Sequence, residues 1–273
     1  MSRPWRDEVA IYLAPRRLAL VRRGGLRRRV LAAAEVPVPA GPAADLGPLF
    51  TRLGEVLADS TWHRASVRAV VADHPWARYV VVPWLDSRLG ASARLAHARY
   101  LLGDTYGDAV ADWAVTLSEA PPGRSCVACA MPPGLRSSLE DALAPAELAL
   151  LSLRPRLVVA FNAWRRHLPA NDAWFVSLDD GSLSAVHLRQ GAWDRVHMAR
   201  LSPDWALELE RLQAFARLTR DAKGSGRMFV DGPAWMRRKV GGSNGLEWLT
   251  EGEGDEEPGT PGGELALLRR VNA

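Results

Sequence analysis

The sequence is poor in cysteine and lysine, and it contains no long apolar run. Its 273 residues include two cysteines, Cys126 and Cys129, which excludes a disulfide scaffold and leaves one CxxC pair, too few ligands for a structural zinc site. The pair lies in an apolar run that reads as a strand, so its thiols should point to opposite faces, as core cysteines do. No run approaches the roughly 18–20 apolar residues that span a bilayer. The start, MSRPWRDEVAIYL, carries charges where a signal peptide is apolar.

Basic side chains are nearly all arginine, because lysine occurs only at Lys223 and Lys239. A GC-rich genome explains such a bias, so the pI near 9.5 is weak evidence for nucleic-acid binding. Seven arginines lie between Arg16 and Arg29, whereas EGEGDEEPGTPGG near the end is acidic and glycine-rich, as a loop or tail would be. The six histidines show no metal-ligand spacing. We therefore expect no metal and no nucleic-acid partner.

Two stretches share one pattern at a constant offset of 165 residues, 9–22 and 174–187. Each is an apolar run, a four-residue turn and a second apolar run, followed by a glycine turn and a third strand. The first turn is Ala14-Pro15-Arg16-Arg17 in one copy and Asp179-Asp180-Gly181-Ser182 in the other. The sequence thus predicts the same three-stranded meander at the opening of each half.

Periodicity predicts alternating strands and helices, the pattern of an α/β protein. Strands are expected at 8–14, 18–23, 26–36, 66–74, 77–84, about 109–118, 125–131, 147–153, three in 174–201, and 227–231. Helices are expected at 46–58, within 85–103, at 134–144, at 155–168, after Ser202-Pro203-Asp204 and after 234. The helix within 85–103 should have Leu89, Ala93, Ala96 and Tyr100 on one face. The helix after Asp204 should turn inward the residues Trp205, Leu209, Leu212, Phe215 and Ala216.

We divide the chain into a first lobe at 1–77, to which helix 155–168 returns, and a small α+β insertion at 78–153. A second, reduced lobe follows at 172–250, and 251–273 is an acidic, glycine-rich loop with a C-terminal segment.

The order of these elements resembles the PilM family of type IV pilus machines and its relatives, MshI and the cytoplasmic part of GspL. The matching passages cover about residues 8–240 and are VAIYLAPRRLALV, VVVPW, CVACAMPPGLRSSLEDAL, ELERLQAFAR and MFVDGPAW. The resemblance implies a two-lobed actin-like (ribonuclease H-like) fold. It also implies a cytoplasmic protein peripheral to the inner membrane, which docks the cytoplasmic tail of a bitopic partner as PilM docks PilN. An oligomer is compatible with it.

The nucleotide motifs of that family are altered here. Its metal-associated aspartate falls on Tyr12 and its turn glycine on Ala14, so this turn does not suit Mg²⁺ or phosphates. In the second half the matching positions are Ser177 and Asp179. A single helix follows the second meander where full-length relatives carry a subdomain beside the adenine pocket. The vestigial cleft then comprises Tyr12, Ala14, Arg16, Arg17, Ser177, Asp179, Asp180, Gly181, Ser182 and Gly232.

We accordingly expect a pseudo-ATPase scaffold with no catalytic residue and no bound ATP or Mg²⁺. One alternative is an active Mg-ATP-binding ATPase that uses Asp179, Asp180 and Asp231; another is an arginine-rich nucleic-acid-binding protein. Asp-Gly is also simply a good hairpin turn. The candidate partner-binding residues are Arg22, Arg23, Arg27, Arg28, Trp76, Tyr79 and Trp84. Their structural alternatives are a solvated hairpin edge for the arginines and core packing for the aromatics.

Overall fold

The structure is a computed structural model, which describes residues 7–25, 28–39, 41, 45–84, 90–170, 172–179, 181–201, 205–218, 227–233, 236–238, 245–249 and 268. The chain forms two compact units. Unit 1 comprises Met1–Trp76, Pro133–Val159 and Gly259–Ala273, and unit 2 comprises Ala77–Pro132 and Ala160–Pro258. The expected insertion at 78–153 therefore contributes to both units, and the boundary crosses helix α5 (Arg156–Trp164).

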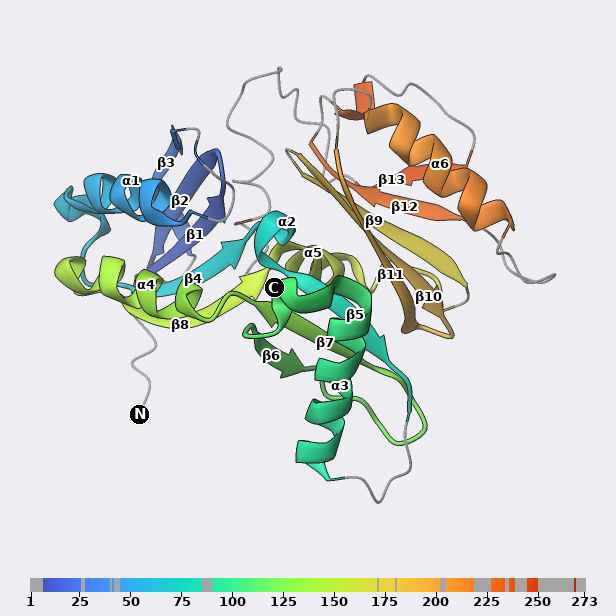
Figure 1. Ribbon diagram of the computed structural model, residues 1–273. Coiled ribbons are helices and arrows are strands. Elements are labelled where there is room, and N and C mark those ends of the chain that lie inside the picture. Colours follow the sequence, from blue (N-terminus) through green and yellow to red (C-terminus); the bar gives the residue numbers. More distant parts are fainter. Residues whose placement is uncertain are drawn as a thin grey trace. The chain divides into compact units, whose positions relative to one another are not determined.

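Unit 1 is built on a five-stranded sheet of order β3-β2-β1-β4-β8 (Figure 1). The first three strands form an antiparallel meander, while β4 pairs in parallel with both β1 and β8. The strands are β1 (Glu8–Ala14), β2 (Arg17–Gly24), β3 (Arg29–Pro37), β4 (Ser66–Val71) and β8 (Ala149–Pro155). β1 and β2 are continuous apolar runs because both of their faces are buried.

Helices cover the sheet of unit 1 with leucines at helical spacing. In α1 (Gly47–Leu57) a proline occupies the first turn, and Leu49, Leu53 and Leu57 are buried at intervals of four residues. α4 (Gly134–Leu143) buries its own leucines in the same way and packs on α1 and β8. The short elements of this unit are η1 (Ser60–Trp62), α2 (Asp73–Trp76) and η3 (Ala144–Ala146).

Unit 2 contains a second five-stranded sheet, of order β11-β10-β9-β12-β13. Its strands are β9 (Ala173–Asp179), β10 (Ser182–Arg189), β11 (Ala192–Arg200), β12 (Met228–Asp231) and β13 (Leu246–Trp248). One face packs on α6 (Trp205–Leu218), whose Trp205, Leu209 and Leu212 join a core with Trp174 and Val176. The predicted inward residue Phe215 is instead 42% exposed, because it lies at the border of the buried stripe.

The two sheets repeat one plan, as the sequence predicts. β1 and β9, and likewise β2 and β10, have equal lengths and start 165 residues apart (173 − 8 and 182 − 17). In each half two parallel strands follow the meander, and a bulge interrupts the outer pair at the same place, between Arg22 and Arg23 in one and between His187 and Leu188 in the other. The repeat therefore extends to topology and to local irregularity.

A third sheet, of order β5-β7-β6, also lies in unit 2 and carries α3 (Ala91–Tyr106) along it (Figure 1). Its strands are β5 (Arg78–Val82), β6 (Ala114–Leu117) and β7 (Cys126–Met131). The predicted strand 109–118 is too long, because η2 (Gly107–Val110) and a turn occupy its start. None of the helices in the described parts of the chain is long and apolar enough to cross a bilayer.

The buried face of α3 differs from the predicted one. Ala98 and Leu102 point inward, whereas Ala93 and Ala96 are exposed and Tyr100 is 68% exposed. Leu89, the other residue of the predicted face, lies outside the described residues. The helix is rich in small and polar residues on all sides, so its sequence carries almost no amphipathic signal, and the contact with the sheet decides its orientation.

Candidate functional site

The first hairpin places a buried tyrosine where the resembled family has an acid. Tyr12 lies on β1 opposite Ala19 on β2 and Val70 on β4, and its side chain is fully buried. Directly paired residues share a face of the sheet. This face of the first sheet therefore presents no carboxylate at the level of Tyr12.

The turn of this hairpin is tight and closes without glycine. Ala14 pairs with Arg17, which leaves Pro15 and Arg16 as the two turn residues. Arg16 is exposed, whereas Arg17 donates to Glu35 on β3 at 3.2 Å. Proline offers no backbone N–H, so a phosphate would find fewer donors here than in a glycine-rich turn.

The second hairpin is polar at the matching positions. Asp179 pairs with Ser182 across its turn, and both are buried. Gly181 has a φ of 102°, a conformation that favours glycine in this turn. Asp180, the other predicted turn residue, lies outside the described residues. This turn combines a buried carboxylate with a buried hydroxyl, a pairing that the first turn lacks.

Five buried polar residues gather on one face of the second sheet and form what we call the hairpin cluster. The cluster consists of Ser177, Asp179, Ser182, Ser184 and Asp231. Register places them on one face, because Ser177 pairs with both Ser184 and Asp231. Within it, the Asp231 carboxylate accepts a 2.8 Å hydrogen bond from Nε1 of Trp164 on α5. This interaction anchors the helix end to the sheet within unit 2.

The two halves therefore differ at equivalent positions of the meander. Tyr12 and Ala19 of the first half correspond to Ser177 and Ser184 of the second, at the 165-residue offset. At these two strand positions, two serines of the second half stand where the first half has a tyrosine and an alanine. The residues present in the first hairpin do not fit ATP with Mg²⁺, and no cluster of three or more possible metal ligands occurs among the described residues.

The loop after β12 holds Gly232, the last residue of the expected vestigial cleft. A Cβ at Gly232 would lie 3.0 Å from Cβ of Leu178, so the close approach of the two chains favours glycine there. Pro233 follows and is buried. Packing is sufficient to explain this glycine.

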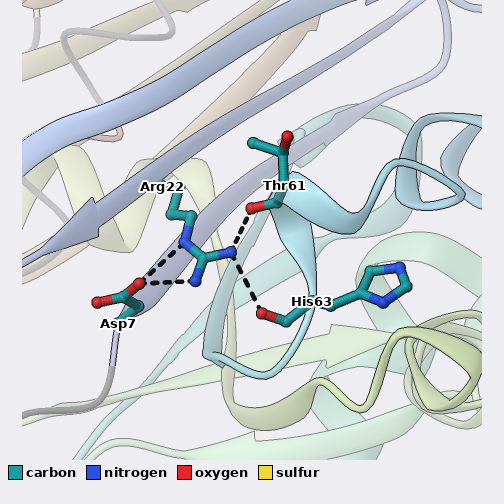
Figure 2. A network of polar contacts seen from close by, with 4 residues as sticks. All are labelled: Asp7, Arg22, Thr61 and His63. Carbon is teal, nitrogen blue, oxygen red and sulfur yellow. Dashed lines mark hydrogen bonds and ion pairs between the residues drawn. The ribbon is translucent and has the colours of Figure 1, made fainter.

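Arg22 binds within unit 1 (Figure 2). Its Nε and Nη2 donate to Oδ2 of Asp7 at 3.0 and 2.6 Å, and its Nη1 donates to the carbonyl oxygens of Thr61 and His63, the latter at 3.2 Å. The guanidinium thus joins β2, the chain before β1 and the loop around η1. This arrangement, which we call the Arg22 clamp, is structural, and it occupies a residue that the sequence suggested for partner binding.

The neighbouring arginines differ in their surroundings. Arg23 is buried, and its Nη2 donates to the carbonyl of Leu268 at 2.8 Å, which ties a C-terminal residue to β2. Arg28 is exposed and lies 3.9 Å from Glu8. Arg27 lies outside the described residues. Of the predicted partner-binding arginines, Arg22 and Arg23 are therefore held within unit 1, whereas Arg28 is exposed.

Two of the three candidate aromatics are core residues. Trp76 and Tyr79 are each 2% exposed. Trp84 is 37% exposed and lines a cavity of about 450 Å³ beside β5, together with Arg94 and Cys126. Burial raises the pKa of the Cys126 thiol, opposite to the shift that activates a redox cysteine.

Sequence inspection missed one buried acid. Asp73, directly after β4, is 1% exposed, and both of its carboxylate oxygens accept from the backbone N–H of Leu157, at 3.1 and 3.0 Å. A carboxylate at the start of a helix is favourable because it meets free N–H groups and the positive end of the helix dipole. An aspartate that follows a buried strand was the available signal.

The two histidines of the second meander, His187 and His197, lie on the adjacent strands β10 and β11. His187 Nδ1 lies 3.0 Å from Oδ2 of Asp194, and its ring packs on Trp174. His197 pairs with Ala185 and is exposed, and partial desolvation lowers its pKa.

Comparisons with known proteins agree with this fold. No protein-family model matches the sequence, and no curated protein matches it. Among solved structures, the chain is similar to a PilM–PilN type IV pilus biogenesis complex (TM-score 0.65, 16% identity, 90% of this chain and 89% of that chain).

It is also similar to the cytoplasmic domain of EpsL, an inner-membrane component of the type II secretion system of Vibrio cholerae (TM-score 0.59, 13% identity, covering 97% and 94%). A third neighbour is a Bacteroides thetaiotaomicron protein with an actin-like ATPase fold and unknown function (TM-score 0.58, 10% identity, covering 86% and 85%). These similarities, at low identity, together with the duplicated sheets, confirm the predicted fold class: the chain has the α/β actin-like fold of the PilM and EpsL structures.

Proposed function

We propose that the chain is an actin-like scaffold of a type IV pilus or type II secretion-like machine, which works without nucleotide and binds the cytoplasmic tail of a bitopic, PilN-like inner-membrane protein. The proposal places it in the cytoplasm, peripheral to the inner membrane. Its support is the fold, shared with a PilM–PilN complex and an EpsL cytoplasmic domain over most of each chain.

The observation that carries the loss of nucleotide binding is the buried Tyr12. Tyr12 pairs with Ala19 and Val70, and it stands at the position where the resembled family has its metal-associated aspartate. The turn that follows holds a proline and an exposed arginine. Catalysis of phosphoryl transfer relies on metal and phosphate contacts, and the first hairpin offers no carboxylate at Tyr12 and no backbone N–H at Pro15.

A titration of the purified protein with Mg²⁺-ATP and Mg²⁺-ADP tests this part. Native-state binding raises the free energy of unfolding by RT ln(1 + [L]/Kd), about 2.7 kcal/mol at one hundred times Kd. We expect no change in melting temperature at millimolar nucleotide. A Mg²⁺-dependent rise would favour the active ATPase, and Asp179→Ala would then be expected to remove it.

Partner docking is tested by co-purification from detergent-solubilised membranes of the native cells. We expect a single-span inner-membrane protein to accompany the tagged chain, and we expect deletion of that protein's cytoplasmic tail to abolish the association. Recovery of the chain only in the soluble fraction, with no tail-dependent partner, would contradict the scaffold function. A salt-sensitive shift of DNA in a gel would instead point to the nucleic-acid alternative.

A further inference from the structure

The outer strand of the first meander has an open and apolar edge. β3 (Arg29–Pro37) pairs with β2 and with no other described strand. Between Val30 and Ala34 it carries only apolar side chains, and Val30 and Leu31 are 45% and 57% exposed. Half of the backbone groups of an edge strand point away from the sheet. Proteins normally protect such edges with charges, and the middle of this one has none.

In the second half, the equivalent edge strand β11 is protected by a charged residue at its bulge. A bulge places Leu31 as the extra residue of β3, since Arg22 pairs with Ala32 and Arg23 with Val30. In β11 the extra residue at the same place is Asp194. That aspartate lies within ion-pair distance of His187, Arg189 and Arg195. One duplicated position thus carries a paired charge in one half and an exposed leucine in the other.

Cations stand at both ends of the β3 edge. Arg29 begins the strand and is exposed, and Arg16 is exposed at the other end, where its carbonyl accepts from the N–H of Val38 at 2.9 Å. Neither of these two arginines has an ion-pair partner within the described part of the chain. Glu35, the acid on β3, is already paired with Arg17.

The two arginines determine which kind of segment can pair with the β3 edge. Antiparallel pairing of β3 with a second copy, centred on Ala33, would bring Arg29 of each copy opposite Pro37 of the other, next to Arg16. Like charges at such positions destabilise a strand pair. An extended segment with an apolar middle and acidic ends would instead meet a cation at each end. Added strands gain affinity from backbone hydrogen bonds and selectivity from their side chains.

We propose that the β3 edge, Val30–Val36, is a strand-addition site for an extended apolar peptide with acidic ends. The inference rests on the proposed function in one respect: it assigns this site to the partner's cytoplasmic tail. Its core is the backbone pairing along Ala32–Val36, flanked by the exposed apolar surface of Leu31.

The direct test uses a fluorescein-labelled peptide as long as β3, nine residues, with alternating valine and threonine and an aspartate at each end. We expect saturable binding in fluorescence anisotropy, at least tenfold weaker for Leu31→Glu and for Arg29→Glu. Leu151→Glu is the matched control, because Leu151 is the extra residue of a bulge on β8, the opposite edge of the same sheet, and is 54% exposed. It should bind like the wild type.

Altered peptides test the mode of binding. Methylation of alternate backbone nitrogens removes the hydrogen-bond donors on one side of a strand and keeps the side chains, so one of the two possible sets should abolish binding and the other should not. Lysines in place of the aspartates should weaken binding at least tenfold. Undiminished binding of both methylated peptides, or of the lysine peptide, would overturn the proposal, as would equal loss in Leu31→Glu and Leu151→Glu. A concentration-dependent dimer that Leu31→Glu dissociates would assign the edge to a second copy instead.

The co-purification separates this inference from the proposed function. Loss of the membrane partner in Leu31→Glu, with retention in Leu151→Glu, supports both. Retention in the two variants leaves the scaffold function standing and removes the tail from the β3 edge. If no tail-dependent partner is found even with the wild type, the scaffold function fails, and the peptide titration alone decides whether the edge accepts a strand. Melting temperatures close to the wild type confirm that each variant is folded.

Discussion

Replacement of Arg22 by alanine should destabilise the first unit by about 2–4 kcal/mol. The side chain of Arg22 is 17% exposed and that of Asp7 28%, so solvent screens the pair only partly. The guanidinium also holds the carbonyl oxygens of Thr61 and His63. Each hydrogen bond to a charged group contributes about 1.5–3 kcal/mol, and the contributions of one side chain are not additive.

The same network predicts the relative stability losses of related variants. Asp7→Ala removes one partner of the guanidinium and leaves two, so it should cost less than Arg22→Ala. Arg22→Lys should cost about 1–2 kcal/mol, because an ammonium group cannot reproduce the forked contact. The control is Arg52→Ala, which breaks an exposed pair with Glu55 and should change stability by about 0.5 kcal/mol or less.

Hydrogen exchange measured by mass spectrometry suits these variants, because it reports local opening and does not require the two units to unfold together. Peptides that cover β2 and η1 should lose protection in Arg22→Ala, while peptides from the second sheet should not. Protection within about 0.5 kcal/mol of the Arg52→Ala control would refute a structural role for Arg22. The arginine would then again be a candidate for partner contact.

Three further predictions concern other polar groups. Asp73→Asn should lower stability by about 1–2 kcal/mol, because it removes the charge that faces the start of α5, and thermal unfolding would measure it. Trp164→Phe should cost about 1–3 kcal/mol, since the buried Asp231 loses a donor, whereas Trp62→Phe, which removes no known hydrogen bond, should not show this specific loss. Partial desolvation lowers the pKa of His197 in the folded state although its side chain is exposed, so the effect is small, and the unfolded state binds more protons below pH about 6.5. Melting temperature should therefore fall as pH decreases through that value, and less so in His197→Gln; an equal fall in both would contradict it.

The repeated sheets were predictable because local chemistry encodes them. Strands buried on both faces need continuous apolar runs, and two-residue turns need residues such as Pro15 or Gly181. Both signals recur at the 165-residue offset, and β1 begins and ends where the sequence indicates. The short strand β13 was not predicted, because three residues carry too little periodicity to distinguish a strand from a loop.

The polar contacts of the site were less predictable because they join residues that are far apart in the sequence. Trp164 meets Asp231 across 67 residues, and Arg22 meets the carbonyl of Thr61 across 39. Nothing near an arginine in the sequence distinguishes a clamped side chain from a free one. The prediction of which face of α3 is buried failed for a related reason. An alanine-rich helix presents several plausible faces, and tertiary contact selects one.

The duplication supplies the strongest argument about function, because each half acts as a reference for the other. A position constrained only by the fold should carry similar residues in both copies. Ser177 and Tyr12 do not meet that expectation, nor do Asp194 and Leu31. In the first half the strand position holds a buried tyrosine, and the bulge of the edge strand holds an exposed leucine. A chain released from nucleotide chemistry but dependent on an extended partner would change in these two places, whereas an active ATPase would keep the first and protect the second.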